Sequence, residues 1–511
     1  QHSKTVRMYL YYTFQPFILM LTFKTPCLKE VYGFGKVEKR NVVADFSGGE
    51  ITSDAGLLLI STVDRTVRLS QQIAACFEDH RDPTRIEHKV DDLIAQRIYG
   101  LIQGYPDLND HDQLRHDPLF GVAVGKLESH HARSAALAGK STLHRLEHAI
   151  NESKDPSAYQ GLSVNPEQLR TLFVEFALAQ HPIAPSLMIL DMDVTDDEVH
   201  GHQEQSFYNT YYDSTCYAPL LIFWGRHLLA ARLRPSNVDP AEGALEEIAR
   251  IIPLIQQRWP QTLIMVRGDS AYARDDLMTW CEVHNVDYVF GLSKNERLLR
   301  ITQDLVASVE NDYRQRKQLA QDFFEKHLGK DIVNEAQLQT LVTPAIWYRS
   351  VPYQTLDTWS QSRRVVCKLT YDEKGINRRF LVTSYSAEAV SPGRLYCDQY
   401  CPRGEMENRI KEHQLDLFSD RTSAHRFEVN QLRLWFSSFA YTLMQALRDR
   451  GLFKTELATA QMGTIRKTLL KMGARVRISV RRVHIAFCSS SPFRALFDKV
   501  YQRLFAATNT G

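Results

Sequence analysis

Residues 186–194 read S-L-M-I-L-D-M-D-V, an apolar run that ends in two acidic residues. A short run of this kind, rich in aliphatic side chains, is typical of a strand buried inside a sheet. Two further runs follow, Y-A-P-L-L-I-F-W-G at 217–225 and H-L-L-A-A-R-L at 227–233, and both also predict strands. Together the three runs indicate the start of a β-sheet.

The segment after these strands alternates between helix and strand. Residues 240–258 have the apolar spacing of a helix, which Pro253 is expected to kink or end early. A strand T-L-I-M-V-R at 262–267, a helix at 274–284 and a strand V-D-Y-V-F-G-L at 286–292 complete the series. Three strands, helix, strand, helix and strand is the order of a ribonuclease-H-like sheet. We therefore expect an α/β fold with such a core.

The remaining regions differ from this core in composition. Residues 1–35 include an apolar run, 9–23, which Pro16 interrupts and which is shorter than the roughly 20 residues of a membrane-spanning helix. We expect a dispensable extension there, with a signal peptide as the alternative. The expected domains are a mostly helical domain at 36–185, the first part of the core at 186–295, a strand-rich insertion at 296–400, the last part of the core at 401–450 and a basic C-terminal region at 451–511.

The charge is uneven along the chain. The whole sequence has a formal net charge of +2 at pH 7. Residues 451–511 hold eleven Lys and Arg against only Glu456 and Asp498, a local net charge of +9. A basic tail on a mildly acidic body predicts a polyanionic partner. The eight cysteines lack zinc-finger spacing, so we interpret them as reduced thiols of a cytosolic protein.

Residues 400–414 read Y-C-P-R-G-E-M-E-N-R-I-K-E-H-Q and predict a charged helix. Pro402 suits the first turn of this helix, which would leave Tyr400 just outside it. An ordinary row of i,i+4 salt bridges is one explanation of the charges. The other is a functional face, because four side chains fall within one narrow arc at about 100° per residue. These four are Arg403, Glu407, Lys411 and Gln414.

Three carboxylates stand out by position. Asp193 ends the first predicted strand, Asp269 follows the strand at 262–267, and Glu407 lies on the charged helix. Carboxylates that follow neighbouring strands meet at the carboxyl edge of a sheet, where α/β proteins build their sites. Three hard oxygen donors with open positions suit two magnesium ions. A pair of such ions can support phosphoryl transfer.

These motifs resemble a known family, the DDE transposases of bacterial insertion sequences, and within it the group labelled IS-thirteen-eighty. The resemblance rests on D-x-T at 193–195, R-G-D-S at 267–270 and Y-x2-R-x3-E at 400–407, and it extends from D-F-S-G-G-E-I-T-S-D-A-G at 45–56 to the tail G-A-R-V-R-I-S-V-R-R at 473–482. It covers nearly everything after Lys36.

The resemblance implies that Asp193, Asp269 and Glu407 are the catalytic, metal-binding triad. It also implies that Tyr400 and Arg403 hold DNA phosphates. The family signature continues to a Lys seven residues beyond the Glu, where this chain has Gln414; Lys411, one turn earlier, is the alternative. Asp191 lies on the same side of its strand as Asp193 and stays open as the first ligand.

The basic tail contains a second candidate surface. Arg475, Arg477, Arg481 and Arg482 alternate with apolar residues, and no acidic residue occurs between Leu457 and Phe497. A solvated strand face is one explanation of this pattern. We favour contact with the DNA backbone, which would weaken steeply with salt.

The family resemblance implies a DNA transposase that moves its insertion sequence by cut-and-paste. Magnesium-dependent cleavage at terminal inverted repeats would precede strand transfer into target DNA, with Mn²⁺ able to substitute. The expected partners are double-stranded DNA and a second protomer, with the 36–185 domain binding DNA or the partner protomer. No membrane partner is expected, and the location would be the bacterial cytoplasm, at the nucleoid when bound to DNA. The alternatives are a two-metal nuclease or resolvase on the same fold, and a catalytically silent DNA-binding protein derived from a transposase.

Overall fold

The computed structural model describes residues 31–130, 134–151, 159–328 and 342–506. The chain divides into two units, and the boundary between them in the sequence falls between Ile51 and Thr52, within the short strand β3 (Ile51–Thr52). In the first unit, β1 (Tyr32–Val37) and β2 (Arg40–Ala44) form an antiparallel hairpin. Except for residues 31–35, the extension predicted at 1–35 lies outside the described residues.

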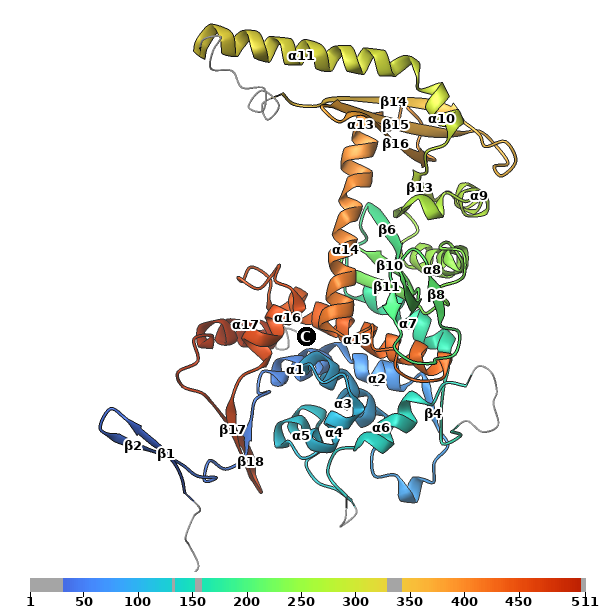
Figure 1. Cartoon of the computed structure of the whole chain (residues 1–511). Coiled ribbons are helices and arrows are strands. Elements are labelled where there is room, and N and C mark those ends of the chain that lie inside the picture. The colour runs from blue at the N-terminus through green and yellow to red at the C-terminus, as the bar shows by residue number, and fades with distance from the viewer. Residues whose placement is uncertain (1–30, 131–133, 152–158, 329–341, 507–511) are drawn as a thin grey trace, which may run out of the picture. The chain divides into compact units, whose positions relative to one another are not determined.

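The second unit is built on a large sheet. Within the described part of the chain this sheet has eight strands (Figure 1). In spatial order they are β11 (His227–Arg232), β10 (Leu220–Trp224), β6 (Leu187–Val194), β12 (Leu263–Gly268), β13 (Asp287–Leu292), β16 (Gly375–Thr383), β15 (Arg363–Asp372) and β14 (Ala345–Tyr353). The strands β6, β12 and β13 are parallel to one another, and β10 is antiparallel to β6.

The chain order of the first five strands is the one predicted. After β6, β10 and β11 come α8 (Ala244–Arg258), β12, α9 (Asp275–Val283) and β13. The apolar runs form strands because both faces of the sheet are covered, so nearly every side chain in β10, β12 and β13 is buried. Pro253 neither ends nor shortens α8, which continues through it to Arg258.

The strands predicted as an insertion extend the same sheet. Strand β16 pairs antiparallel with β13, and β15 and β14 follow outward. The helices α10 (Glu296–Ile301) and α11 (Asp304–Leu328) precede them in the chain. Two small hairpin strands, β8 (Phe207–Asn209) and β9 (Ser214–Tyr217), follow β6, and β7 (Asp197–Glu198) pairs with β9. This excursion lies next to the carboxyl end of β6.

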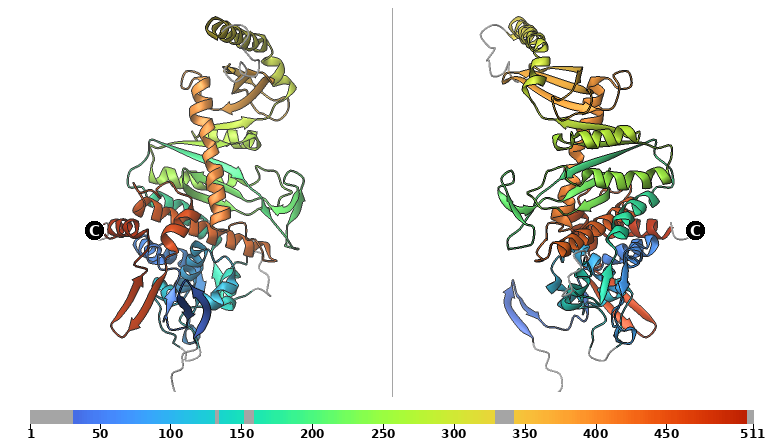
Figure 2. Two further views of the ribbon diagram at one scale, coloured as in Figure 1. Left: turned by 60° about the vertical axis from the view of Figure 1, so that its left-hand side comes forward. Right: turned by 90° about the vertical axis from the view of Figure 1, so that its right-hand side faces the viewer.

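Helices dominate the rest of the unit. Before the sheet come α1 (Leu57–Val67), α2 (Leu69–Ala74), α3 (Val90–Gln103), α4 (His111–Leu114), α5 (Pro118–Val124), α6 (Lys140–Glu147) and α7 (Pro166–Ala179), with β4 (Phe77–Asp79) paired to β5 (Leu162–Val164). After it comes α15 (Phe427–Gly451), which is buried on most sides and packs against α1, α3 and β11 (Figure 2). A helix that is apolar over so much of its surface must be enclosed by protein. No described helix is both long and apolar enough to cross a membrane.

One continuous helical run crosses from the sheet to α15. It begins with α13 (Pro392–Arg394), passes through a π-helical segment (Leu395–Tyr400) and a 3-10 turn (Cys401–Arg403), and continues as α14 (Gly404–Lys411) into a second π-helical segment (Glu412–Asp416). The expectation that the helix starts at Pro402 and excludes Tyr400 is therefore wrong. Proline lacks an N–H donor and crowds the preceding turn, which normally ends or kinks a helix. Around Pro402 the backbone instead adopts local π-helical and 3-10 geometry, and the helix continues.

The run is fixed to α15 by buried polar contacts. Glu412 accepts a hydrogen bond from Arg448 at 2.8 Å, and the ring of His413 lies 2.9 Å from the hydroxyl of Ser438. The chain then passes through α16 (Met462–Ile465) to the antiparallel hairpin of β17 (Ala474–Ser479) and β18 (Arg482–Phe487), and it ends with α17 (Arg494–Ala506).

Candidate active site

The two acidic residues of β6 have different partners. Asp191 is buried and forms a bidentate ion pair with Arg267 of the neighbouring strand β12, with Nε–Oδ1 and Nη2–Oδ2 distances of 2.5 and 2.8 Å. Arg267 also donates to the carbonyl oxygen of Gln399 in the helical run. Both oxygens of Asp191 are thus engaged in holding β6, β12 and the helix together.

Asp193 lies two residues further, at the end of β6. Its Oδ2 accepts a hydrogen bond from Nη1 of Arg403 at 2.7 Å, and its Oδ1 accepts one from its neighbour's backbone N–H, that of Val194, at 3.0 Å. Burial raises the pKa of Asp193, and the charge of Asp269 raises it further, against the opposing effect of Arg403. The pKa of Arg403 is raised as well, because the nearby acids outweigh its burial. The helical run therefore places a permanent cation on the first predicted catalytic carboxylate.

Asp269 follows β12, the strand parallel to β6. Its Oδ1 accepts a hydrogen bond from the backbone N–H of Ala271 at 2.9 Å and so caps a 3-10 turn. The backbone packs tightly here, because a Cβ on Gly291 of β13 would lie 2.9 Å from both the Ser270 nitrogen and the Tyr400 hydroxyl. Gly291 thus allows Tyr400 to approach the turn that carries Asp269. The pKa of Tyr400 is raised, chiefly by burial.

A cavity of about 600 Å³ lies beside Asp193 and Asp269 and is lined by both. It is also lined by Asn209, Tyr211, Tyr212, Arg234, Tyr272 and Arg274. Tyr272 is fully buried, and within the described residues its hydroxyl has no hydrogen-bond partner. Burial and the charge of Asp193 raise its pKa well above the ordinary value. The sequence motifs do not identify Tyr272, because no local pattern shows that its hydroxyl is left unpaired beside a cavity.

Glu407 is placed differently from the two aspartates. It lies on α14 one turn after Arg403, and its side chain is exposed. Within the described residues its carboxylate makes no hydrogen bond or ion pair, and no three His, Cys, Asp or Glu side chains are close enough together to hold a metal ion. The structure thus brings Asp193, Asp269, Arg403 and Tyr400 together and leaves Glu407 apart from them.

The aspartate pair has the chemistry of a cation site. Two carboxylates line one cavity, and a guanidinium already compensates one of them. Hard oxygen donors at the mouth of a solvated cavity are what Mg²⁺ and Mn²⁺ prefer. The donor set therefore fits a divalent cation held by Asp193 and Asp269.

Gln414 stands where the family signature has a lysine, and it binds protein. Its Nε2 donates to the carbonyl oxygen of Asp196 at 2.8 Å and to Oδ1 of the buried Asp197 at 3.1 Å. Its Oε1 accepts from the hydroxyl of Thr195 at 3.2 Å. Gln414 therefore fixes the loop that follows β6, whereas Lys411, the alternative phosphate ligand, has an exposed side chain.

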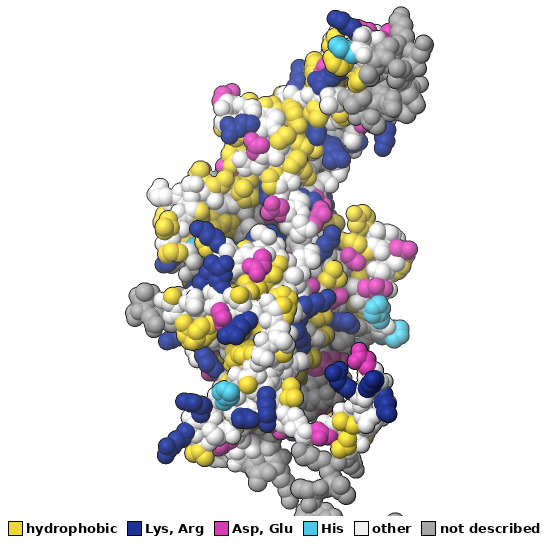
Figure 3. Space-filling view, turned by 90° about the vertical axis from the view of Figure 1, so that its left-hand side faces the viewer, with side chains coloured by type: hydrophobic (Ala, Val, Ile, Leu, Met, Phe, Trp, Pro, Cys, Tyr) yellow, Lys and Arg dark blue, Asp and Glu magenta, His cyan; other side chains and the backbone are white. Residues whose placement is uncertain are grey.

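The four predicted tail arginines lie on the β17–β18 hairpin. Arg475 and Arg477 are exposed on β17, Arg481 is in the turn, and Arg482 begins β18. Figure 3 shows one face of the molecule, on which Lys and Arg side chains are spread among acidic and apolar ones. The hairpin is a surface separate from the aspartate cavity.

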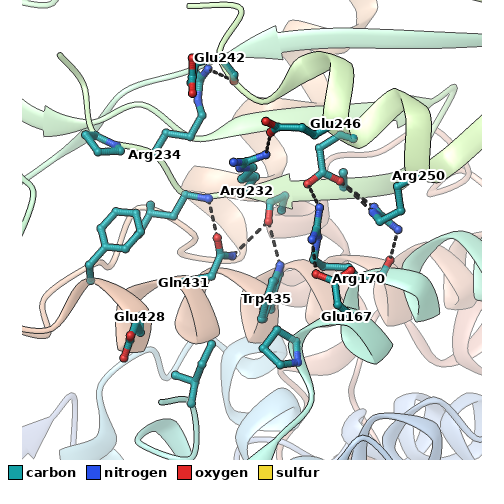
Figure 4. A pocket seen from close by; sticks show the side chains of 18 of the residues that line it. Glu167, Arg170, Arg232, Arg234, Glu242, Glu246, Arg250, Glu428, Gln431 and Trp435 are labelled. Carbon is teal, nitrogen blue, oxygen red and sulfur yellow. Dashed lines mark hydrogen bonds and ion pairs between the residues drawn. The ribbon is translucent and has the colours of Figure 1, made fainter. Parts of the chain in front are cut away.

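A second cavity, of about 680 Å³, lies among α7, β11, α8 and α15 (Figure 4). Its charged side chains bind one another: Glu247 pairs with Arg170 at 2.6 Å and with Arg250 at 2.8 Å. From α15, Trp435 donates to the carbonyl oxygen of Ala231 in β11 at 2.9 Å. Because these charged side chains pair with one another, we interpret the residues around this cavity as structural contacts between the helices and the sheet.

Comparison with known proteins assigns this chain to one family. The family model described as "Transposase DDE domain group 1" matches residues 34–509. Among solved structures, the chain is similar to piggyBac transposase in a cryo-EM synaptic complex with hairpin DNA, at 10% sequence identity and a TM-score of 0.36, over 82% of this chain and 80% of that chain. No curated protein matches the sequence significantly. Because the family model spans nearly all of the described residues, the chain belongs to the transposase DDE domain group 1 family and is a DNA transposase.

Proposed function

We propose that this transposase moves an insertion sequence by cut-and-paste: it cleaves DNA at terminal inverted repeats and joins the freed ends to target DNA. The observation that supports the proposal best is the pair formed by Asp193 and Asp269. Asp193 lies at the end of β6, Asp269 follows the adjacent parallel strand β12, and both line one cavity. Arg403 of the helical run donates a hydrogen bond to Asp193. Active sites of α/β proteins form at this edge of the sheet.

We assign the five strands β11, β10, β6, β12 and β13 to a ribonuclease-H-like core. In support, the first strand in the chain lies at the centre, a hairpin extends it on one side and two parallel strands extend it on the other. Strands β14–β16 then form an insertion that lengthens the sheet. We also propose that the domain at 36–185 binds DNA or the second protomer and that 451–511 is a basic region that contacts DNA.

Transposases of this family use divalent metal ions. We propose that Asp193, Asp269 and Glu407 hold two of them, Mg²⁺ or in its place Mn²⁺. When bound, such ions lower the pKa of an attacking water and stabilise the leaving oxygen of a phosphodiester. Asp191 is unsuited to be the first ligand, because both of its oxygens bind Arg267.

The protein's own residues would position the DNA. Arg403 contacts Asp193, and Tyr400 approaches the turn that carries Asp269. A scissile phosphate bound at these two carboxylates would therefore meet a guanidinium that binds phosphate oxygens and a hydroxyl that donates to them. Arg403 would then exchange Asp193 for the phosphate, which frees that carboxylate. Lys411, exposed two turns after Arg403, would hold a neighbouring phosphate.

The wider assignment follows the family resemblance. We infer that the protein acts as at least a homodimer on paired DNA ends in a bacterial cytoplasm, and that it is of the IS-thirteen-eighty group. The motif Y-x2-R-x3-E at 400–407 supports this subgroup assignment.

The test is a strand-transfer reaction with DNA that carries both ends of the element, a supercoiled target plasmid and Mg²⁺. The proposal predicts cleavage at the ends followed by joining of their 3′-hydroxyls to the plasmid, with both steps blocked by EDTA and restored by Mn²⁺. Cutting without joining would favour a nuclease or resolvase. Binding without cutting at any metal concentration would leave a catalytically silent DNA-binding protein.

A further inference from the structure

The β17–β18 hairpin is held at its base and free at its tip. Ala474 and Val476 are buried in the hydrophobic core that includes α15. Beyond them the strands run out from the helices, as both views of Figure 2 show. The strands pair as far as Ser479 and Arg482, and a two-residue turn, Val480–Arg481, closes the hairpin.

One face of this hairpin is cationic. Arg475 and Arg477 alternate along β17, and His484 of β18 lies directly opposite Arg477. Within the described residues, the guanidinium groups of Arg475, Arg477, Arg481 and Arg482 make no ion pair or side-chain hydrogen bond. Unpaired arginines without nearby acids form a surface for a polyanion.

Near its tip the hairpin also exposes two apolar side chains. Val480 is 103% exposed and Ile478 is 52% exposed. Two-residue hairpin turns favour Asn-Gly or Asp-Gly, yet the sequence here is Val-Arg, and neither residue has a positive φ. Turn geometry therefore gives no reason for a β-branched apolar residue at this position, and burial within the described part of the chain gives none either.

We propose that this hairpin enters the minor groove of DNA and that Val480 wedges between two base pairs, which kinks the duplex. The inference rests on the proposed DNA-binding function. Proteins that bend DNA from the minor groove combine arginines with an apolar side chain inserted at a base step. The hairpin has both, with Arg481 and Arg482 beside Val480.

The dimensions agree with this mode of binding. Ser479 lies three residues beyond the buried Val476, a reach of about 10 Å at ~3.3 Å per residue. The minor groove is about 7.5 Å deep, so the tip can reach its floor, but the groove is only about 6 Å wide. Two strands about 4.8 Å apart with their side chains exceed that width. The groove must therefore open around the hairpin, and a kink at a wedged step opens it.

The experiment measures DNA bending by the full chain in EDTA, which prevents cleavage. A 30-base-pair A·T-rich duplex with a donor dye at one end and an acceptor at the other reports bending as energy transfer. The wild-type protein is expected to raise energy transfer at saturation, and netropsin, which occupies the minor groove, is expected to compete with it. V480S is expected to lose most of the rise while its affinity falls less than tenfold.

Two control variants separate the wedge from charge and from general surface effects. V283S changes another exposed valine, 71% exposed at the end of α9, and is expected to bend DNA as the wild type does. The double variant R475Q/R477Q is expected to bind more weakly, with the slope of log K against log salt reduced by about 2. Its saturated complex is still expected to bend DNA.

Several results would overturn the proposal. Equal energy transfer from V480S and the wild type would show that Val480 does not wedge between base pairs. Wild-type binding without any rise in energy transfer would show the same. A loss confined to self-association in sedimentation without DNA, or to binding of phosphatidylserine vesicles, would assign the tip to a second copy or to an anionic membrane. Bending without strand transfer in Mg²⁺ would keep the wedge and reject the proposed enzyme function, whereas absence of DNA binding would reject both.

Discussion

Arg403 donates a hydrogen bond to Asp193 at 2.7 Å across a separation of 210 residues. This contact joins the helical run to the carboxyl end of β6 and compensates a carboxylate that also feels the charge of Asp269. The same guanidinium is the group that we expect to bind phosphate. We therefore expect DNA phosphate to compete with Asp193 for Arg403, and metal ions to compete with Arg403 for Asp193.

The two β6 aspartates should separate stability from activity. Asp191→Asn breaks a buried bidentate pair and leaves Arg267 without its counter-charge, so we expect the free energy of unfolding to fall by about 3 kcal/mol. Asp193→Asn should abolish strand transfer but lower the unfolding free energy by less than about 1 kcal/mol, because it also removes a like charge beside Asp269. Urea titration and the strand-transfer assay measure the two effects. The reverse pattern, with Asp193 structural and Asp191 catalytic, would contradict the assignment.

Tyr272 should matter for DNA and not for folding. Its buried hydroxyl has no partner within the described residues, so Tyr272→Phe is expected to leave the unfolding free energy unchanged or raise it by up to about 1 kcal/mol. If the hydroxyl contacts DNA in the cavity, cleavage should slow about tenfold. A variant that is as active as the wild type would show that the hydroxyl has no role in the reaction.

Gln414 should behave as a structural residue. Gln414→Leu deprives the Asp196 carbonyl and the buried Asp197 carboxyl of a donor, and we expect a loss of about 1–3 kcal/mol in urea-induced unfolding. Gln414→Lys should retain most of the stability, because an ammonium can donate to the same acceptors. Leu415→Gln, at the exposed neighbouring position, is the control and should change little. An unchanged free energy of unfolding in Gln414→Leu would show that the hydrogen bonds of Gln414 do not contribute to stability.

His413 should make the protein less stable in acid. Burial lowers its pKa from 6.5 to about 3. Below pH 6.5 the unfolded chain therefore takes up a proton that the folded chain does not, and stability is lost as the pH falls from 6.5 towards 3. Between pH 7 and pH 5 this residue alone should remove about 2 kcal/mol. His413→Gln should show a correspondingly smaller loss over that range, and an identical pH dependence in both proteins would contradict the argument.

The sequence was sufficient where local pattern and burial agree. The apolar runs that became β10, β12 and β13 are buried on both faces, and β6 is buried on one face and partly buried on the other. Composition alone therefore identified these strands and placed Asp193 and Asp269 at strand ends. The parallel pairing of β6 and β12 then brought both residues to one cavity.

The features that the sequence did not reveal depend on contacts between distant segments. The helix passes through Pro402 because the run is anchored at its far end, where Glu412 and His413 bind α15. The choice between Asp191 and Asp193 required knowledge of Arg267, 76 residues away from Asp191. Local sequence rules contain neither contact.

The central claim is that Glu407 completes the catalytic triad although it lies exposed and apart from the aspartates. The most direct measurement compares Glu407→Gln with Glu405→Gln, two exposed glutamates on the same helix, in the strand-transfer assay with Mg²⁺. DNA binding and the unfolding free energy are measured in parallel. The account predicts that Glu407→Gln binds the element ends but loses cleavage and joining by at least a thousandfold, while Glu405→Gln retains both. Activity in Glu407→Gln equal to that of Glu405→Gln would contradict it.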